Sequence, residues 1–182
     1  MEANYISRPG VEPLWEIKDW DLPEVEWTPN EPHIHYDGTI PSQLRVEMLK
    51  PYDENWTYKW NEHIDNLNNI IISTDQLLID QMWKAPHWKN FNIPKSQALV
   101  INDKEGFEMG YHIDNRGILG VLLINIQDNE DSTLFMEDYI APTRKGTGFF
   151  MLNNSQNHRI NVTKNRFIVY QTLNTASMFT NM

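Results

Sequence analysis

The sequence of 182 residues contains no cysteine. A chain without cysteine has no disulfide, no thiolate metal ligand and no cysteine nucleophile, and this composition is typical of a reducing compartment. No apolar run approaches the roughly 18 residues that a membrane-spanning helix needs. The start of the chain also lacks the basic region and the apolar segment of a secretory signal. We therefore expect a cytoplasmic protein with no membrane segment.

Positive charge is also scarce. Lys and Arg number 15 against 25 Asp and Glu, so that the formal net charge is −10 and the pI is about 4.9. A protein that binds the phosphate backbone of nucleic acid usually carries a basic face, and this sequence shows none. We therefore expect a protein, a peptide or a small molecule as the partner, and not nucleic acid. The sequence does not indicate an oligomeric state.

Tryptophan and proline are concentrated in one half of the chain. All seven Trp and nine of the ten Pro lie before residue 95. No repeat and no flexible linker divides the sequence, so we expect one domain, residues 1–182. In this domain residues 1–95 would form a Pro- and Trp-rich extended segment plus supporting helices, with an edge strand at Leu14–Ile17. Residues 96–175 would form the core that carries the functional site.

The N-terminal half contains one clear helical pattern. Within residues 57–72 four apolar residues recur at spacings of four, three and four, which places them on one face of a helix. A second helix is expected to begin at Ser73 or Thr74, either of which is a suitable N-cap, and to run to about Lys84. We also expect a short helical turn within residues 41–56. The four residues of the apolar stripe are Trp60, Ile64, Leu67 and Ile71.

From Ser96 onward the pattern changes to short apolar segments separated by turn residues. Seven such strands without an intervening helix predict antiparallel sheets that close as a sandwich or a jelly roll. The fold class is therefore mainly β with supporting helices (α+β). The predicted strands are residues 98–102, 107–112, 118–125, 132–137, 147–152, 158–162 and 166–173.

The motif HIDN occurs twice, at His63–Asn66 and at His112–Asn115. Side chains two positions apart share one face of a strand, but they diverge by about 200° on a helix. The first copy lies in the predicted helix, so its His and Asp cannot easily share an ion, and we expect them to be solvated. The second copy ends a predicted strand, where His112 and Asp114 can converge on a metal.

A metal site at the second copy needs a third ligand from elsewhere in the sheet. His158 is the only histidine downstream, and it begins the next-to-last predicted strand. Arg166 follows eight residues later and opens the last strand, where its charge could hold an anion beside the metal. A competing set of His63, Asp65 and His112 has almost the same spacing. Strand context and the position of the arginine favour the downstream set.

In sequence order the chain presents HIDN, VLLIN, STLF, RKGTGFF, HRINV and RF. This order resembles that of the Fe(II)- and 2-oxoglutarate-dependent oxygenases, most of all their prolyl-hydroxylase-like branch, over about residues 98–173. The resemblance implies a double-stranded β-helix (a cupin-like jelly roll) with the N-terminal helices packed on one sheet. It also implies that Arg166 forms a bidentate salt bridge with the distal carboxylate of 2-oxoglutarate. The iron ligands that it implies are His112, Asp114 and His158.

Two features depart from the family pattern. Many relatives carry Gly-Gly before the Thr-x-Phe strand, where this chain has NEDSTLF. Relatives also often supply a hydroxyl group to the cosubstrate from positions that hold Ile168 and Leu123 in this chain. The sequence does not decide between three other candidates for that hydroxyl, which are Tyr111, Thr133 and Tyr170.

The resemblance implies hydroxylation of an unactivated C–H bond of a prolyl or other protein side chain, coupled to oxidative decarboxylation of 2-oxoglutarate to succinate. The cofactors would be Fe(II) and the cosubstrate 2-oxoglutarate, with ascorbate as a reductant. Two alternatives stay open, namely a non-catalytic jelly-roll (cupin-like) module that binds a ligand or carbohydrate, and a cupin-type metalloenzyme that does not use 2-oxoglutarate. The candidates for an apolar wall around the site are Leu123, Phe135, Phe149 and Phe150.

Overall fold

The structure is a computed structural model of the chain. The side chains of residues 31, 32 and 132–136 are not described, although their strands are. The described residues are 1–6, 14–32, 44–49, 53–74, 91–95, 98–112, 118, 120–129, 132–136, 139–152 and 158–173.

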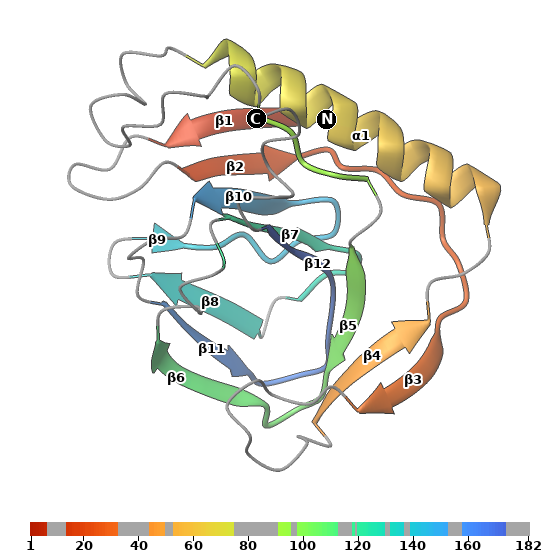
Figure 1. Cartoon of the computed structure of the whole chain (residues 1–182). Coiled ribbons are helices and arrows are strands. Elements are labelled where there is room, and N and C mark those ends of the chain that lie inside the picture. Colours follow the sequence, from red (N-terminus) through yellow and green to blue (C-terminus); the bar gives the residue numbers. More distant parts are fainter. Residues whose placement is uncertain are drawn as a thin grey trace.

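Two antiparallel sheets and one helix make up the described fold (Figure 1). The large sheet has eight strands in the order β1 (Glu2–Ile6), β2 (Leu14–Lys18), β10 (Gly148–Leu152), β7 (Gly120–Asn125), β12 (Arg166–Leu173), β5 (Leu99–Asp103), β4 (Arg45–Leu49) and β3 (Thr28–Pro32). The small sheet has four strands in the order β6 (Glu108–His112), β11 (His158–Val162), β8 (Ser132–Met136) and β9 (Tyr139–Ile140). This arrangement is jelly-roll-like, as the sequence predicted, and all seven predicted strands are present.

The central strands of the large sheet are buried on both faces, and alternate residues point to opposite sides. On β7, Leu122 packs on the helix side of the sheet, whereas Leu123 faces the interior between the two sheets. On β10, Phe150 packs on the helix side and Phe149 faces the interior. The sheet therefore separates two apolar cores, one beneath the helix and one between the sheets.

The helix α1 (Glu54–Ser73) lies along the outer side of the large sheet (Figure 1). Asp53 is its N-cap, and the Asp53 carboxylate accepts a hydrogen bond of 2.7 Å from the backbone N–H of Trp56. The predicted apolar stripe is confirmed, because all four of its residues are fully buried on this face. The helix ends at Ser73, and most of the second predicted helix lies outside the described residues. In the described part of the chain, no helix is both long and apolar enough to cross a membrane.

One prediction for the N-terminal half was confirmed in part and another was wrong. In the segment predicted to contain a helical turn, residues 41–56, the last three residues begin the helix α1, whereas residues 45–49 form the strand β4, which pairs with β5. The segment Leu14–Ile17 is a strand but not an edge strand, because β2 pairs with both β1 and β10. The N-terminal half therefore supplies four strands of the large sheet in addition to the helix.

Residues 19–27, which we call the belt segment, connect β2 near one edge of the large sheet to β3 at the other edge. The backbone N–H of Trp20 donates a 2.9 Å hydrogen bond to the carbonyl oxygen of Gly146. Gly146 has a φ of 74°, a left-handed conformation that glycine adopts at low cost. The carbonyl oxygen of Asp21 lies 2.8 Å from Nε2 of His63 on α1. These contacts hold the belt segment against both the sheet and the helix.

Candidate metal and anion site

The structure brings two of the three predicted metal ligands together. His112 at the end of β6 is the direct cross-strand partner of His158 at the start of β11. Their ring centroids lie 4.4 Å apart, and His158 is buried while His112 is half-buried. Two imidazoles at this separation can bind one ion from adjacent strands.

A backbone hydrogen bond orients the ring of His112. Its Nδ1 lies 2.7 Å from the carbonyl oxygen of Gly110, which can only accept, so Nδ1 carries the proton. The lone pair of the neutral ring is then on Nε2, which is the form in which imidazole binds a metal. This kind of contact commonly fixes the tautomer of a metal-binding histidine.

The third predicted ligand, Asp114, lies outside the described residues. Among the residues that are described, no third histidine or acidic side chain completes a metal-binding group. The ligand set His112, Asp114 and His158 therefore stays a prediction.

The first HIDN copy lies on the other side of the large sheet. His63 belongs to α1, whereas His112 faces the pocket between the sheets, so these two histidines cannot share one ion. The expectation that His63 is solvated was wrong, because it is 7% exposed and packs 5.0 Å from the ring of Trp20. Burial lowers the pKa of His63, and its hydrogen bond to the carbonyl of Asp21 offsets part of that effect. Asp65 is exposed, as expected, and pairs with Lys95 at 2.7 Å.

Arg166 lies on the interior face of β12, but it already has a partner. Its Nε donates a 3.0 Å hydrogen bond to Oδ2 of Asp103, and its Nη2 also donates to that oxygen. Asp103 receives two further hydrogen bonds from Arg45, one of 2.6 Å from Nε to Oδ1 and one of 3.0 Å from Nη2 to Oδ2. These three residues, which we call the arginine–aspartate cluster, face one another directly across β4, β5 and β12.

The cluster is deeply buried, with exposed fractions of 8% for Arg45, 0% for Asp103 and 3% for Arg166. Burial alone would raise the pKa of Asp103, but the hydrogen bonds and charges of both arginines outweigh it and hold the pKa below its usual value. Burial lowers the pKa of Arg166, and the neighbouring carboxylate opposes that change. A guanidinium nevertheless stays charged in proteins. The cluster thus carries two positive charges and one negative charge.

Both histidines and both arginines line one pocket of about 40 Å³ between the two sheets. Leu123 and Phe149 form part of its apolar wall, as predicted, whereas Phe150 points to the helix side and does not. The side chain of Phe135 is not among those described. The other lining residues are Met109, Val121, Met151, Ile160, Ile168 and Tyr170.

Two of the three side chains predicted as candidates to supply a hydroxyl group to a cosubstrate are described, and these two differ in where they lie. Tyr170 lines the pocket, because it follows Arg166 and Ile168 at alternate positions of β12. Tyr111 is 55% exposed and lies beneath the guanidinium of Arg159, whose Cζ is 5.3 Å from the ring centroid. The side chain of Thr133 is not described. Of the two candidates whose side chains are described, Tyr170 is the one that lines the pocket.

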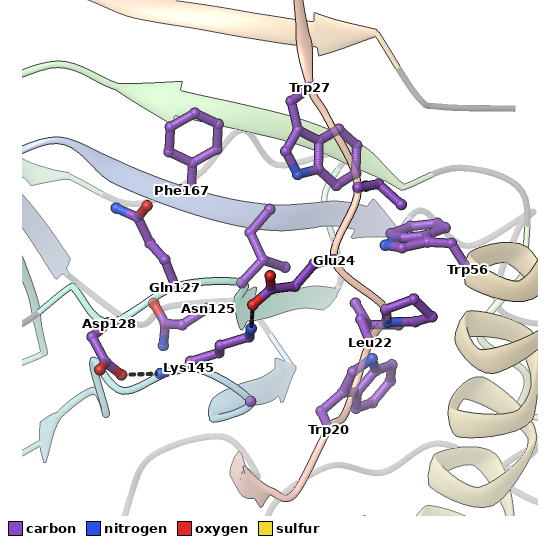
Figure 2. A pocket seen from close by; sticks show the side chains of 14 residues that line it. Trp20, Leu22, Glu24, Trp27, Trp56, Asn125, Gln127, Asp128, Lys145 and Phe167 are labelled. Carbon is purple, nitrogen blue, oxygen red and sulfur yellow. Dashed lines mark hydrogen bonds and ion pairs between the residues drawn. The ribbon is translucent and has the colours of Figure 1, made fainter. Parts of the chain in front are cut away.

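A second, larger hollow of about 420 Å³ lies on the helix side of the sheet, next to the belt segment (Figure 2). Figure 2 shows Trp20, Trp27 and Trp56 along one wall. Glu24 of the belt segment reaches to Lys145 opposite, at 2.9 Å. None of the described histidines lines this hollow, whereas His112 and His158 line the smaller pocket between the sheets.

No protein-family model matches this sequence, and no curated protein matches it. Among solved structures, the chain is similar to a prolyl-4-hydroxylase from Pseudomonas putida, with 10% identity, a TM-score of 0.48, and 81% of this chain and 77% of that chain covered. It is similar to a prolyl hydroxylase from Trichoplax adhaerens, solved with a peptide fragment of hypoxia inducible factor, with 14% identity, a TM-score of 0.47, and 74% and 62% covered. A 2OG-Fe(II) oxygenase family oxidoreductase from Burkholderia pseudomallei shows 10% identity, a TM-score of 0.39, and 100% and 77% covered. The chain thus spans 62% of the length of the Trichoplax chain.

Proposed function

We propose that this chain is an Fe(II)- and 2-oxoglutarate-dependent dioxygenase that hydroxylates an unactivated C–H bond in the cytoplasm. The observation that carries the proposal is the meeting of His112, His158 and Arg166 in one pocket between the sheets. Two neighbouring imidazoles fit divalent iron, which imidazole nitrogens bind well, and a buried guanidinium fits the carboxylate of an organic acid. Asp114, two residues after His112, is proposed as the third ligand.

Bound iron would supply the activation of dioxygen, and 2-oxoglutarate would supply electrons through its decarboxylation to succinate. The chain's own residues would bind and orient these two groups. His112 presents Nε2 because Nδ1 is bonded to Gly110, and the buried His158 is held by its place at the start of β11. Arg166 provides the positive charge for the distal carboxylate of the cosubstrate.

The remaining wall of the pocket keeps water away from the reacting atoms. Leu123, Phe149 and Ile168 are 5% exposed or less and offer no hydrogen bond from their side chains. A dry wall limits side reactions of an oxidising centre. We propose a prolyl or other protein side chain as the substrate, with ascorbate as the reductant that restores the iron.

Anaerobic mixing of the protein with Fe(II) and 2-oxoglutarate tests the proposal. The expected result is a visible charge-transfer absorption band, which Asp114→Ala and His158→Ala abolish. Asp65→Ala is the matched control, because Asp65 occupies the same place in the first HIDN copy and is exposed. No band in the unmodified chain, or an unchanged band in Asp114→Ala, would refute the iron site.

A second candidate is a non-catalytic jelly-roll module that binds a small organic acid. The observation in its favour is that Arg45 and Arg166 both line the pocket, whereas no third metal ligand joins His112 and His158 among the described residues. This candidate predicts ligand binding without formation of succinate from 2-oxoglutarate, whichever peptide or metabolite is supplied. Succinate formation above the background of the Asp114→Ala variant would exclude it.

A further inference from the structure

The arginine–aspartate cluster has one positive charge in excess. Two guanidiniums face a single carboxylate, and all three groups are less than 10% exposed. A buried charge is costly unless it is paired, so an excess charge at this depth favours a bound counter-ion. The acidic protein as a whole, with a net charge of −10, would otherwise repel an anion.

The excess charge is directed at the pocket. Arg45 and Arg166 line it, whereas Asp103 contacts both arginines without lining it. Each arginine uses Nε and Nη2 for Asp103, which leaves Nη1 of each guanidinium outside that contact. Nη1 of Arg45 lies 3.9 Å from the thioether sulfur of Met109, a weak acceptor that an incoming oxygen can replace.

A neighbouring ring also holds Arg45 in place. Its Cζ lies 4.4 Å from the ring centroid of Phe107, a cation–π contact. Its Nε and Nη2 both donate hydrogen bonds to the carboxylate of Asp103. Such a preorganised arginine loses little freedom when it binds a ligand. Like Arg166, Arg45 is therefore held by Asp103 in a fixed position from which it can bind an anion in the pocket.

The size of the pocket limits what the two arginines can receive. A volume of about 40 Å³ corresponds to space for about three water molecules. One carboxylate group is about as large as this space, whereas a sugar or aromatic ring is larger. Among the described lining residues there is no acidic side chain to compete with such a ligand.

We propose that Arg45 is a second anion-binding residue of this pocket, and that Arg45 and Arg166 together receive one carboxylate end of a small organic acid. This inference rests on the proposed function, because it assigns a second contact to the anionic end of the cosubstrate. One incoming carboxylate makes the cluster neutral, with two guanidiniums and two carboxylates. Arg45 belongs to β4, which lies outside the part of the sequence that resembles the oxygenases.

The test compares the unmodified chain with variants that change the charge of the cluster. Calorimetry at low salt measures the affinity of each metal-free protein for succinate and for 2-oxoglutarate. Arg45→Met is expected to weaken succinate binding at least tenfold. The control Arg159→Met changes net charge equally at an exposed site on β11 and is expected to change binding less than twofold. The double variant Arg45→Met/Asp103→Asn restores the net charge of the cluster without restoring Arg45. It should therefore bind as weakly as Arg45→Met.

Binding by the double variant as tight as that of the unmodified chain would mean that only net charge matters, and it would overturn the assignment of a direct contact. A second measurement does not depend on the folding of any variant. In the unmodified chain, the side-chain Nε–Hε NMR signals of both Arg45 and Arg166 should shift on titration with succinate. A shift of the Arg166 signal alone would also overturn the proposal.

Failure of this inference can be told apart from failure of the proposed function. If the charge-transfer band forms and Arg45→Met leaves the affinity for 2-oxoglutarate unchanged, the iron site stands and the two-arginine contact is wrong. If succinate binds in a way that depends on Arg45 but no band forms with Fe(II), the anion contact stands and the iron-dependent reaction is wrong.

Discussion

Replacing Asp103 by Asn removes the only negative charge from a cluster in which it receives four hydrogen bonds from two arginines. The neutral amide accepts through one oxygen, so two buried guanidiniums are left without a counter-charge. Breaking a buried ion pair in this way costs about 3–5 kcal/mol. A domain of this kind is stable by only about 5–15 kcal/mol, so the loss is a large part of the total.

Asp65→Asn is the matched control for Asp103→Asn. Asp65 also forms an ion pair, with Lys95 at 2.7 Å, but the two side chains are 57% and 47% exposed. Water and salt screen such a pair, and its removal costs less than about 1 kcal/mol. The same chemical change should therefore give very different results at the two sites, because burial and not the number of ion pairs decides the cost.

Urea unfolding at neutral pH, followed by tryptophan fluorescence, measures both variants. The dependence of stability on pH at acidic pH gives a second measurement, because the pKa of Asp103 is held below its usual value. The ionised Asp103 carboxylate stabilises the fold fully at a pH above its pKa in the unfolded chain, about 3.9. This stabilisation is lost as the pH falls through the pKa of Asp103 in the folded chain. Asp103→Asn should remove this part of the acid dependence. A loss of stability as small as that of Asp65→Asn would refute the conclusion that burial makes the Asp103 carboxylate indispensable to the two arginines.

Gly148→Ala should lower the free energy of unfolding by about 3 kcal/mol, because a Cβ there overlaps the carbonyl oxygen of Leu123 on β7. Gly110→Ala, where a Cβ meets nothing within 4 Å, should change it by less than about 0.5 kcal/mol in the same urea assay. Burial lowers the pKa of His63, so on acidification the unfolded chain takes up a proton at this residue at a higher pH than the folded chain does. Stability should therefore fall as the pH drops below about 6.5, less steeply in His63→Phe; equal slopes would contradict this. Asp53→Ala should cost about 1 kcal/mol and Asp53→Ser much less, since serine also caps helices; equal losses would mean that the cap bond to Trp56 contributes nothing.

Local patterns in the sequence are sufficient to predict much of the fold. The stripe from Trp60 to Ile71 predicts the helix because its partners are set by helical geometry alone. The turn glycines Gly106 and Gly146 have φ values of 85° and 74°, and both lie in segments rich in turn residues. In each case the deciding interaction spans only a few positions of the chain.

The candidate site is only partly predictable, because its charged residues meet through strand pairing. Arg45 lies in the sequence QLRVEML, whose residues mostly favour helix, but pairing with β5 makes it a strand. Asp103 resembles a turn residue, since it precedes Lys104 and Gly106 in the sequence DKEG. Arg45 and Arg166 lie 58 and 63 positions from Asp103. The one local signal is alternation, because Leu99, Ile101 and Asp103 share one face of β5.

The place of β2 inside the large sheet affects how the chain can fold during synthesis. Trp15 of β2 pairs with Phe150 of β10, which is made 135 positions later. At roughly 5–20 residues per second, the ribosome needs about 7–27 s to supply that partner. During this time the tryptophan-rich N-terminal segment has no large sheet to join, and contacts so distant in sequence also close slowly. A chaperone that binds exposed aromatic segments would therefore have its longest opportunity at residues 14–27 of the nascent chain.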